Sequence, residues 1–179
     1  QGYIADALAR HPAIAAGLVA LFIAKFDPRL GDGDRGQKME AERKAIETAL
    51  DAVSSLDEDR ILRRLVNLID AALRTNFFQI GPDGQPRGTI SIKYDCAKVD
   101  SLPLPRPLYE IFVYSPRVEG IHLRFGKVAR GGLRWSDRPQ DFRTEVLGLV
   151  KAQQVKNAVI VPVGAKGGFV PKHLPPASD

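Results

Sequence analysis

The feature of this sequence that most limits its fold is a change in hydrophobic spacing at the turn-rich residues 81–86. Before this segment, apolar residues recur at the three- and four-residue intervals of amphipathic helices. After it, apolar and polar residues alternate, as on a half-buried strand. We therefore predict a helical region over residues 1–80 and an α/β domain over residues 86–179, with an α+β chain overall.

The first region is predicted to consist of helices that pack against one another. They are expected over residues 4–10, 13–26, about 37–53 and from Ser55 onward. Pro12 either kinks one long helix or begins a second one. Ser55 and Glu58 have the spacing of a capping box, which satisfies backbone N–H groups at a helix start.

The second region is predicted to combine strands with one long helix. Strands are expected over residues 90–96, 109–114 and 120–125, the last two joined by a hairpin at 115–117. A loop rich in glycine and arginine follows at 127–137, then a helix over about 139–157 and a short apolar strand at 158–161. That strand leads into a second glycine-rich loop, which holds Lys166.

The net charge of +5 is distributed unevenly along the chain. Residues 1–100 hold 14 Lys and Arg against 15 Asp and Glu, whereas residues 101–179 hold 12 against 6. A basic second half attracts anions, either nucleic acid or small dicarboxylates, and charge alone does not choose between them.

Two glycine patterns in the chain have the letters of nucleotide-binding motifs without their context. Residues 31–36 match G-x-G-x-x-G but follow a predicted helix instead of a strand, and they place two aspartates where a pyrophosphate would sit. We expect a flexible interhelical loop there. Residues 126–131 lack the Lys-Ser/Thr of a phosphate loop, so no cofactor-binding residues are assigned.

Lys166 is the strongest catalytic candidate in the sequence. It stands between glycines, where a ligand can approach the backbone closely. A lysine withdrawn from water near other cations loses affinity for its proton and can act as a base or nucleophile. The alternative is a solvated surface lysine.

Three more cations precede Lys166 and are candidate anion ligands, namely Arg130, Arg134 and Lys156. An arginine offers a planar fork to a carboxylate, and a lysine offers a point charge. They converge on Lys166 only if the helix between them packs back over the sheet. Each arginine has an alternative role, either as a solvated charge or in an ion pair with an acidic residue, for which the candidates are Asp137, Asp141 and Glu145.

These residues form an ordered set that resembles the active-site segment of glutamate dehydrogenases, in the form typical of the large bacterial NAD-dependent class. The set comprises RGGLRW at residues 130–135, the helix from Glu145 to Lys156, and VPVGAKGGF at residues 161–169. The likeness covers residues 127–172. A looser likeness in the helices before it rests on residues 11–12 and 22–28.

The resemblance implies oxidative deamination of L-glutamate to 2-oxoglutarate and ammonium, as part of amino-acid catabolism. It assigns Lys166 as the catalytic lysine, which activates water, and Lys156 as the ligand of the substrate α-carboxylate. Arg130 stands where smaller family members carry a lysine for the distal carboxylate. Arg134, Gly131 and Gly132 match the glycine-arginine motif that contributes to substrate binding.

The resemblance also implies an incomplete enzyme. Residues 86–179 would be the first part of the substrate-binding domain of an NAD-dependent parent enzyme, expected to be a homo-oligomer. The single cysteine, Cys96, fits a reducing cytoplasm, and no metal is proposed because the three histidines are scattered. Gln1 at the front indicates an excised segment without a signal peptide.

Two other functions remain open from the residues alone. A basic module could contact nucleic acid through residues 124–143, although these include only one aromatic residue and two aspartates. The long helices could instead serve oligomerisation. Retention on DNA that depends on salt would favour the first, and a concentration-dependent mass in solution would favour the second.

The isolated 179-residue chain is expected to show no dehydrogenase turnover. In the resembling family the nucleotide-binding domain and the catalytic aspartate lie beyond the lysine segment. The check is an assay of NADH formation with purified chain and glutamate. A clear rate would contradict the expectation.

Overall fold

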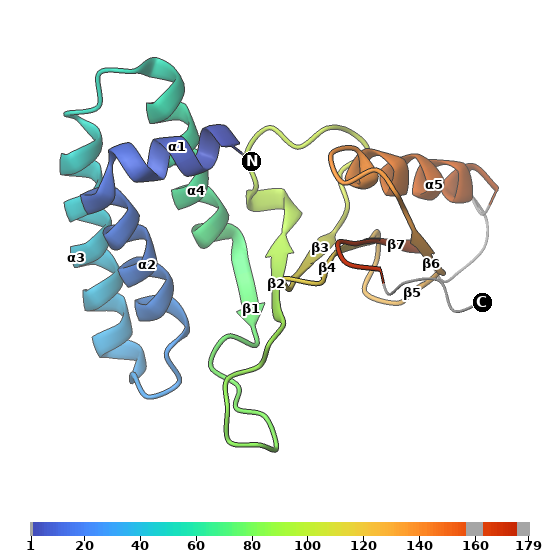
Figure 1. Cartoon of the computed structure of the whole chain (residues 1–179), viewed down its shortest axis with the longest axis horizontal. Helices are drawn as coiled ribbons and strands as arrows, with labels where there is room; N and C mark the ends of the chain where they lie inside the picture. The colour runs from blue at the N-terminus through green and yellow to red at the C-terminus, as the bar shows by residue number, and fades with distance from the viewer. Residues whose placement is uncertain (1, 157–162, 175–179) are drawn as a thin grey trace. The chain divides into compact units, whose positions relative to one another are not determined.

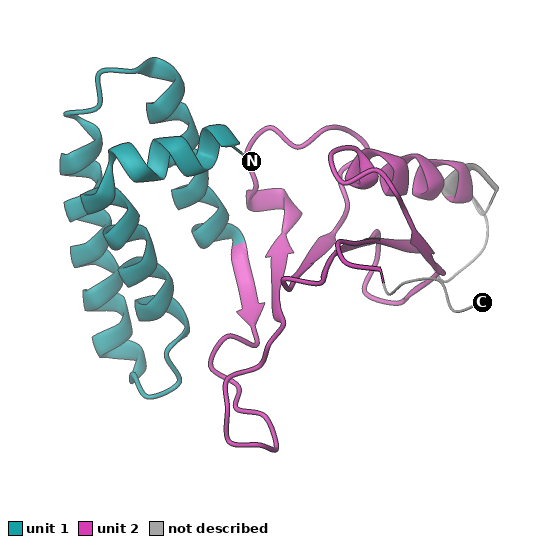
Figure 2. Ribbon diagram, in the orientation of Figure 1, with its two compact units in different colours: residues 1–71 teal, residues 72–179 magenta. Residues whose placement is uncertain are grey.

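The computed structural model describes residues 2–156 and 163–174, and the chain divides into two compact units (Figures 1 and 2). The first unit comprises residues 1–71 and the second residues 72–179. The boundary between the units lies before the turn-rich residues 81–86. The reason is that residues 72–75 form a strand, which pairs with the strand at residues 90–95 and so belongs to the sheet. That first strand was not predicted from the sequence.

The first unit is a set of four helices around a common apolar core. They are α1 (Gly2–Arg10), α2 (Pro12–Phe26), α3 (Asp32–Leu50) and α4 (Leu56–Ala71). Pro12 begins α2, where its missing N–H costs nothing, so the sequence contains two helices here instead of one kinked helix. The buried core residues come from α2, α3 and α4, and they are Ile14, Leu18, Leu21, Ile46, Leu50 and Leu62.

The predicted capping box at the start of α4 is half formed. The backbone N–H of Glu58 donates to Ser55 Oγ at 3.4 Å. The Glu58 carboxylate is bound elsewhere, because it pairs with Arg10 and with His11 Nε2, the latter at 2.8 Å. Ser55 thus caps α4 as expected, while Glu58 ties α4 to the junction of α1 and α2.

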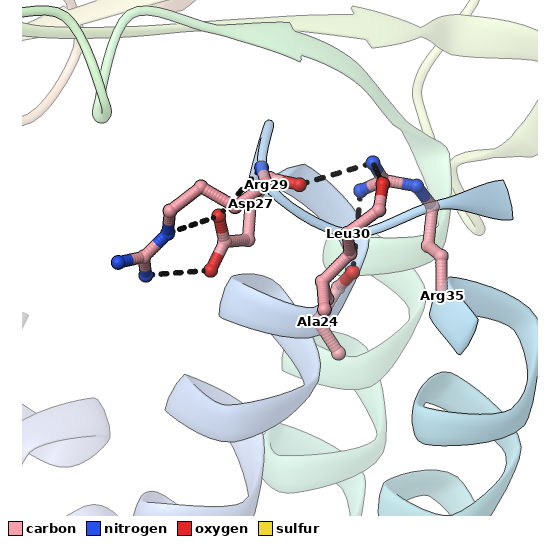
Figure 3. A network of polar contacts seen from close by, with 5 residues as sticks. All are labelled: Ala24, Asp27, Arg29, Leu30 and Arg35. Carbon is pink, nitrogen blue, oxygen red and sulfur yellow. Dashed lines mark hydrogen bonds and ion pairs between the residues drawn. The ribbon is translucent and has the colours of Figure 1, made fainter.

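The expectation of a flexible loop at residues 31–36 was wrong, because α3 already begins at Asp32. Arg35 lies in the first turn of α3, and its guanidinium reaches back to the end of α2 (Figure 3). It donates to four backbone carbonyls, those of Ala24, Lys25, Asp27 and Leu30. A cation there satisfies carbonyls that have no helical partner and interacts favourably with the helix dipole.

A second arginine closes the same turn by a different contact. Arg29 donates through Nε and Nη2 to the Asp27 carboxylate at 2.9 and 2.8 Å (Figure 3). Hydrogen bonds from Arg29 lower the pKa of Asp27 from 3.8 to about 2. The turn between α2 and α3 is therefore fixed by two neighbouring arginines, of which Arg29 is mostly exposed.

In its described residues the second unit is a mixed seven-stranded sheet with one α-helix and a short 3-10 helix, η1 (Cys96–Lys98). The strands are β1 (Ala72–Thr75), β2 (Ile90–Asp95), β3 (Tyr109–Tyr114), β4 (Val118–Arg124), β5 (Ala129–Arg130), β6 (Leu133–Trp135) and β7 (Val163–Pro171). They lie in the order β1-β2-β3-β4-β7-β5, with β6 also paired to β7. The predicted β3–β4 hairpin is confirmed, and its turn is closed by a hydrogen bond from Ser115 N to Val118 O at 2.9 Å.

The single long helix of this unit, α5 (Phe142–Lys156), packs on one face of the sheet. Its core side chains, Phe142, Val146, Leu147 and Val150, contact residues of β4 and β7 in one buried cluster. The helix was predicted over nearly the same residues. The predicted cations could converge on Lys166 only if this helix packed back over the sheet. The structure meets that condition, since α5 covers β7, the strand that carries Lys166.

Two predicted loops are strands in the structure. Residues 127–137 contain β5 and β6, and Lys166 lies in the middle of β7. Both segments are rich in glycine, which is usually unfavourable in strands, but here the glycines allow the two segments to lie against each other. The predicted strand at 158–161 falls outside the described residues.

Among the described residues, no single helix is long and apolar enough to cross a bilayer. The consecutive helices α1 and α2 reach that composition only together, and they are bent by 104° at Pro12.

Replacing Arg35 by alanine should destabilise the first unit by about 1 to 3 kcal/mol, because the substitution removes hydrogen bonds from a charged donor to carbonyls at the end of α2. Urea unfolding of the chain followed by helical circular dichroism measures the change. The matched control is Arg29→Ala, which removes a neighbouring but exposed arginine and should cost less. Equal losses for the two variants would contradict the capping role.

Candidate active site

The candidate site is built on a close parallel approach between residues 129–135 and β7. Arg130 pairs with Gly164, Leu133 with Gly167 and Arg134 with Gly168. In each pair the two residues are separated by the same number of positions along the chain, before as well as after Gly131 and Gly132. The strands β5 and β6 therefore pair with β7 in one continuous register. In this register Gly132 stands opposite Lys166.

Gly131 permits this approach because it has no side chain. A Cβ at this position would lie 1.3 Å from the backbone oxygen of Ala165, a contact that no side chain can make. The next residue completes the contact, since Gly167 N donates to Gly132 O at 3.1 Å. A Cβ at Gly132, in contrast, would meet no atom within 4 Å. Gly131 is thus needed for packing, and Gly132 leaves open space.

Lys166 lies on the face of the sheet that α5 covers. Its register partner on β4 is Leu123, which is fully buried in the cluster beneath α5. Alternation along the strand puts Gly164 and Gly168 on the same face, two residues to either side. Lys166 is therefore a half-buried side chain in a row of glycines, neither the loop residue that was predicted nor a solvated surface lysine.

Helix α5 fills the space above the two flanking glycines. A Cβ at Gly164 would lie 2.9 Å from Gln153 Oε1, and one at Gly168 would lie 2.4 Å from Val146 Cγ2. The Lys166 side chain therefore leaves the sheet between two positions at which the helix touches the strand. The open side of this row is the one toward Gly132.

Arg130 and Arg134 share the face of Lys166, because bridge partners in a sheet point the same way and their partners are Gly164 and Gly168. Both arginines are exposed. Neighbouring strands lie about 4.8 Å apart, so the backbone of both arginines is close to the strand that carries Lys166. Three of the four predicted cations thus come together on one face of the sheet.

Arg134 also forms one of the ion pairs that the sequence offered as an alternative. Its Nε lies 3.2 Å from Glu145 Oε1, while 61% of the arginine side chain stays exposed. The pairing and an anion-binding role are therefore compatible in space. Lys156 is the last residue of α5, and the position of its side chain lies outside what the structure describes.

Gln153 is a site residue that sequence reasoning missed. Its Nε2 donates to the backbone oxygen of Arg130 at 3.3 Å. Its Oε1 is buried and has no hydrogen-bond partner among the described residues, which is uncommon for a polar atom. A signal was available, because Gln153 continues the buried helical stripe of Phe142, Val146 and Val150 with a polar side chain.

A pocket of about 520 Å³ lies between β6 and α5. It is lined by Arg134, Trp135, Ser136, Asp137, Arg138, Glu145, Gly148 and Leu149. This volume is in the range of small-molecule sites. Arg134 belongs both to this lining and to the row around Lys166, whereas Arg130 and Lys166 are not part of the lining.

No group of three or more metal-ligating side chains occurs within the described ranges 2–156 and 163–174. The residues at the start of α3 also do not fit a dinucleotide, because they follow helix α2 and place Asp32 and Asp34 in the first turn. The chemistry that the described site offers is therefore recognition of an anion beside an amine.

Comparison with known proteins gives consistent matches over the whole chain. Residues 45–179 match the family described as bacterial NAD-glutamate dehydrogenase, catalytic domain, and residues 1–28 match the family described as glutamate dehydrogenase, helical motif 3. The chain is 62% identical over 176 residues to an NAD-specific glutamate dehydrogenase of Pseudomonas aeruginosa, with 97% of the chain covered. It is 58% identical to that of Halomonas elongata and 56% identical to that of Mycobacterium tuberculosis, with 100% of the chain covered in each case. It spans about 11% of the length of each of these relatives.

Replacing Gly131 by alanine should destabilise the second unit by more than about 2 kcal/mol, since the new methyl group meets backbone that cannot move aside without opening the sheet. Gly132→Ala is the matched control, and it should change stability by less than about 1 kcal/mol because its Cβ position is open. Denaturant unfolding followed by Trp135 fluorescence measures both. Equal stability of the two variants would contradict the packing role of Gly131.

Proposed function

This chain belongs to the family of bacterial NAD-dependent glutamate dehydrogenases, and on that premise we propose that its second unit supplies part of the glutamate-binding site of a longer enzyme. The proposed reaction is the oxidative deamination of L-glutamate to 2-oxoglutarate and ammonium, with NAD as the hydride acceptor. The observation that carries the proposal is the placement of Lys166, half-buried among glycines, with Arg130 and Arg134 on the same face.

The arginines are proposed to bind the carboxylates of the substrate. Glutamate carries two carboxylates, and a planar guanidinium can donate two parallel hydrogen bonds to either. Arg130 and Arg134 are four residues apart along one edge, and an arginine is well suited to the distal carboxylate for which smaller family members use a lysine. Lys156 is proposed to bind the α-carboxylate.

Lys166 is proposed to carry the proton transfers at the substrate carbon. Removal of a hydride from the carbon that bears the neutral amino group leaves a protonated imine, and water must add to it before ammonia can leave and take up a proton as ammonium. An amine beside the imine can take a proton from that water and stabilise the intermediate that forms. Gly132, which stands opposite Lys166, leaves open space beside this amine because a Cβ there would meet no atom within 4 Å.

Gln153 is proposed to complete the wall of the site on the side of α5. Its unpartnered Oε1 is an acceptor in a row otherwise rich in donors. It is suited to an N–H donor such as the amino group of the substrate. This contact would explain a buried polar atom that has no other partner in the described chain.

NAD is proposed to bind in a part of the enzyme other than the described residues, which contain no fitting dinucleotide loop. The cofactor supplies the hydride acceptor when bound. The same proposal includes the remainder of the longer polypeptide as a partner, homo-oligomerisation, and a role in glutamate catabolism in the cytoplasm. The buried, unpaired thiol of Cys96 is compatible with a reducing compartment.

The alternative functions receive no support from the comparisons. A nucleic-acid surface over residues 124–143 is weakened further by ion pairing, because Arg143 donates to both carboxylate oxygens of Glu110. Phosphate binding requires such arginines to be available.

In the full-length enzyme that carries this chain, Lys166→Ala should lower kcat by a factor of about 100 to 10,000, the usual contribution of general acid–base catalysis. The measurement is NADH formation at saturating glutamate. Lys151→Ala is the matched control, since it removes an exposed lysine from α5 outside the proposed site, and it should leave the rate unchanged. Turnover of Lys166→Ala at the wild-type rate would refute the proposed function.

A further inference from the structure

Glu145 forms an ion pair with Arg134 through one carboxylate oxygen and accepts a hydrogen bond from Ser136 through the other. Its Oε1 lies 3.2 Å from Arg134 Nε, and its Oε2 accepts a hydrogen bond from Ser136 Oγ at 2.9 Å. The Glu145 side chain is 25% exposed, compared with 61% for Arg134. The carboxylate is thus the more fixed partner, and the guanidinium extends from it toward solvent.

Ser136 anchors this arrangement to the sheet. It is buried, and its backbone N–H donates to Phe169 O of β7 at 2.8 Å. Its Oγ also accepts from the backbone N–H of Arg138 at 3.1 Å. The orientation of the Glu145 carboxylate is therefore set by a residue attached to the same strand that carries Lys166.

The helix is attached to the sheet next to this pair. Val146 follows Glu145 and packs at Gly168, which is the register partner of Arg134. The start of α5 and the edge strand β6 therefore meet at one place, and Arg134 and Glu145 face each other across it. This contact is part of the wall of the 520 Å³ pocket, because both residues line it.

The pairing through Nε leaves a defined part of the guanidinium for another ligand. An arginine has five N–H donors in a rigid plane, and the ion pair that the structure shows is made at Nε, at one edge of that plane. In the described structure those terminal nitrogens belong to a mostly exposed side chain that lines the pocket. A carboxylate entering the pocket meets an arginine that the ion pair with Glu145 already restrains.

We propose that Glu145 is a positioning residue, which holds Arg134 so that its terminal nitrogens bind a carboxylate of the dicarboxylate substrate in the pocket between β6 and α5. This inference rests on the proposed function and deepens it. A side chain held in place before binding loses less conformational freedom on binding, so the gain appears as affinity for the carboxylate.

The test uses the full-length enzyme with the substitution Glu145→Gln. Glutamine keeps an acceptor for Ser136 but removes the negative charge that holds Arg134. The KM for glutamate and the dissociation constant of glutarate, an unreactive dicarboxylate, should each rise about fivefold, the upper end of what a partly exposed ion pair contributes. The value of kcat should change much less, and the KM for NAD should stay the same.

The control is Asp141→Asn, which removes a negative charge from an exposed position one turn earlier, just before α5. It should leave glutarate binding unchanged. A double-mutant cycle then separates positioning from a merely structural role. If Glu145 acts through Arg134, adding Glu145→Gln to Arg134→Gln should cause no further loss of glutarate affinity.

Binding of glutarate, measured by calorimetry, distinguishes the two possible failures. Undetectable binding to the wild-type enzyme would count against the proposed function itself. Normal binding to both the wild-type enzyme and Glu145→Gln would overturn only the role of Glu145. A further loss in the double variant, or a similar loss in Asp141→Asn, would also overturn it.

Discussion

The close parallel contact between residues 129–135 and β7 is the constraint on which the second unit depends. It exists because Gly131 brings backbone against the Ala165 oxygen where any side chain would collide. The contact fixes the register of both strands, and the register places Arg130, Arg134 and Lys166 on one face. Without it, the three cations would be distant charges on separate segments.

Arginines of the second unit form ion pairs that differ in how many of the arginine N–H donors remain available to another ligand. Arg143 is held by Glu110 in a two-point contact and is half-buried, so it serves the packing of α5 on the sheet. Arg134 is held at one edge and remains mostly exposed. The two arginines thus differ in how many of their donors are occupied, and this difference is why Arg134 is the one proposed to bind an anion. In the first unit, Arg35 illustrates the structural extreme, since four backbone carbonyls accept from it. Figure 3 draws three of these residues, Ala24, Asp27 and Leu30.

Several elements were predictable because their causes are local. The α2 start at Pro12, the Ser55 cap and the β3–β4 hairpin follow from residue types within a few positions of one another. Other elements were not, and the glycine-rich residues 127–137 and 163–168 are the main case. Glycine has no strand preference of its own, so these residues indicated loops. They form strands only because each segment finds the other across a long stretch of chain, an interaction that local patterns do not contain.

The sequence by itself determined the helical and strand halves of the chain, the lysine between glycines and the order of basic residues that resembles one family. These depend on residue type and spacing along the chain. Only the tertiary structure decided that Lys166 lies within a strand under α5, that Arg134 is held by Glu145, and that Gln153 faces the same row. Those relations depend on which distant segments pack together, and packing is decided by the fit of side chains and backbone in three dimensions.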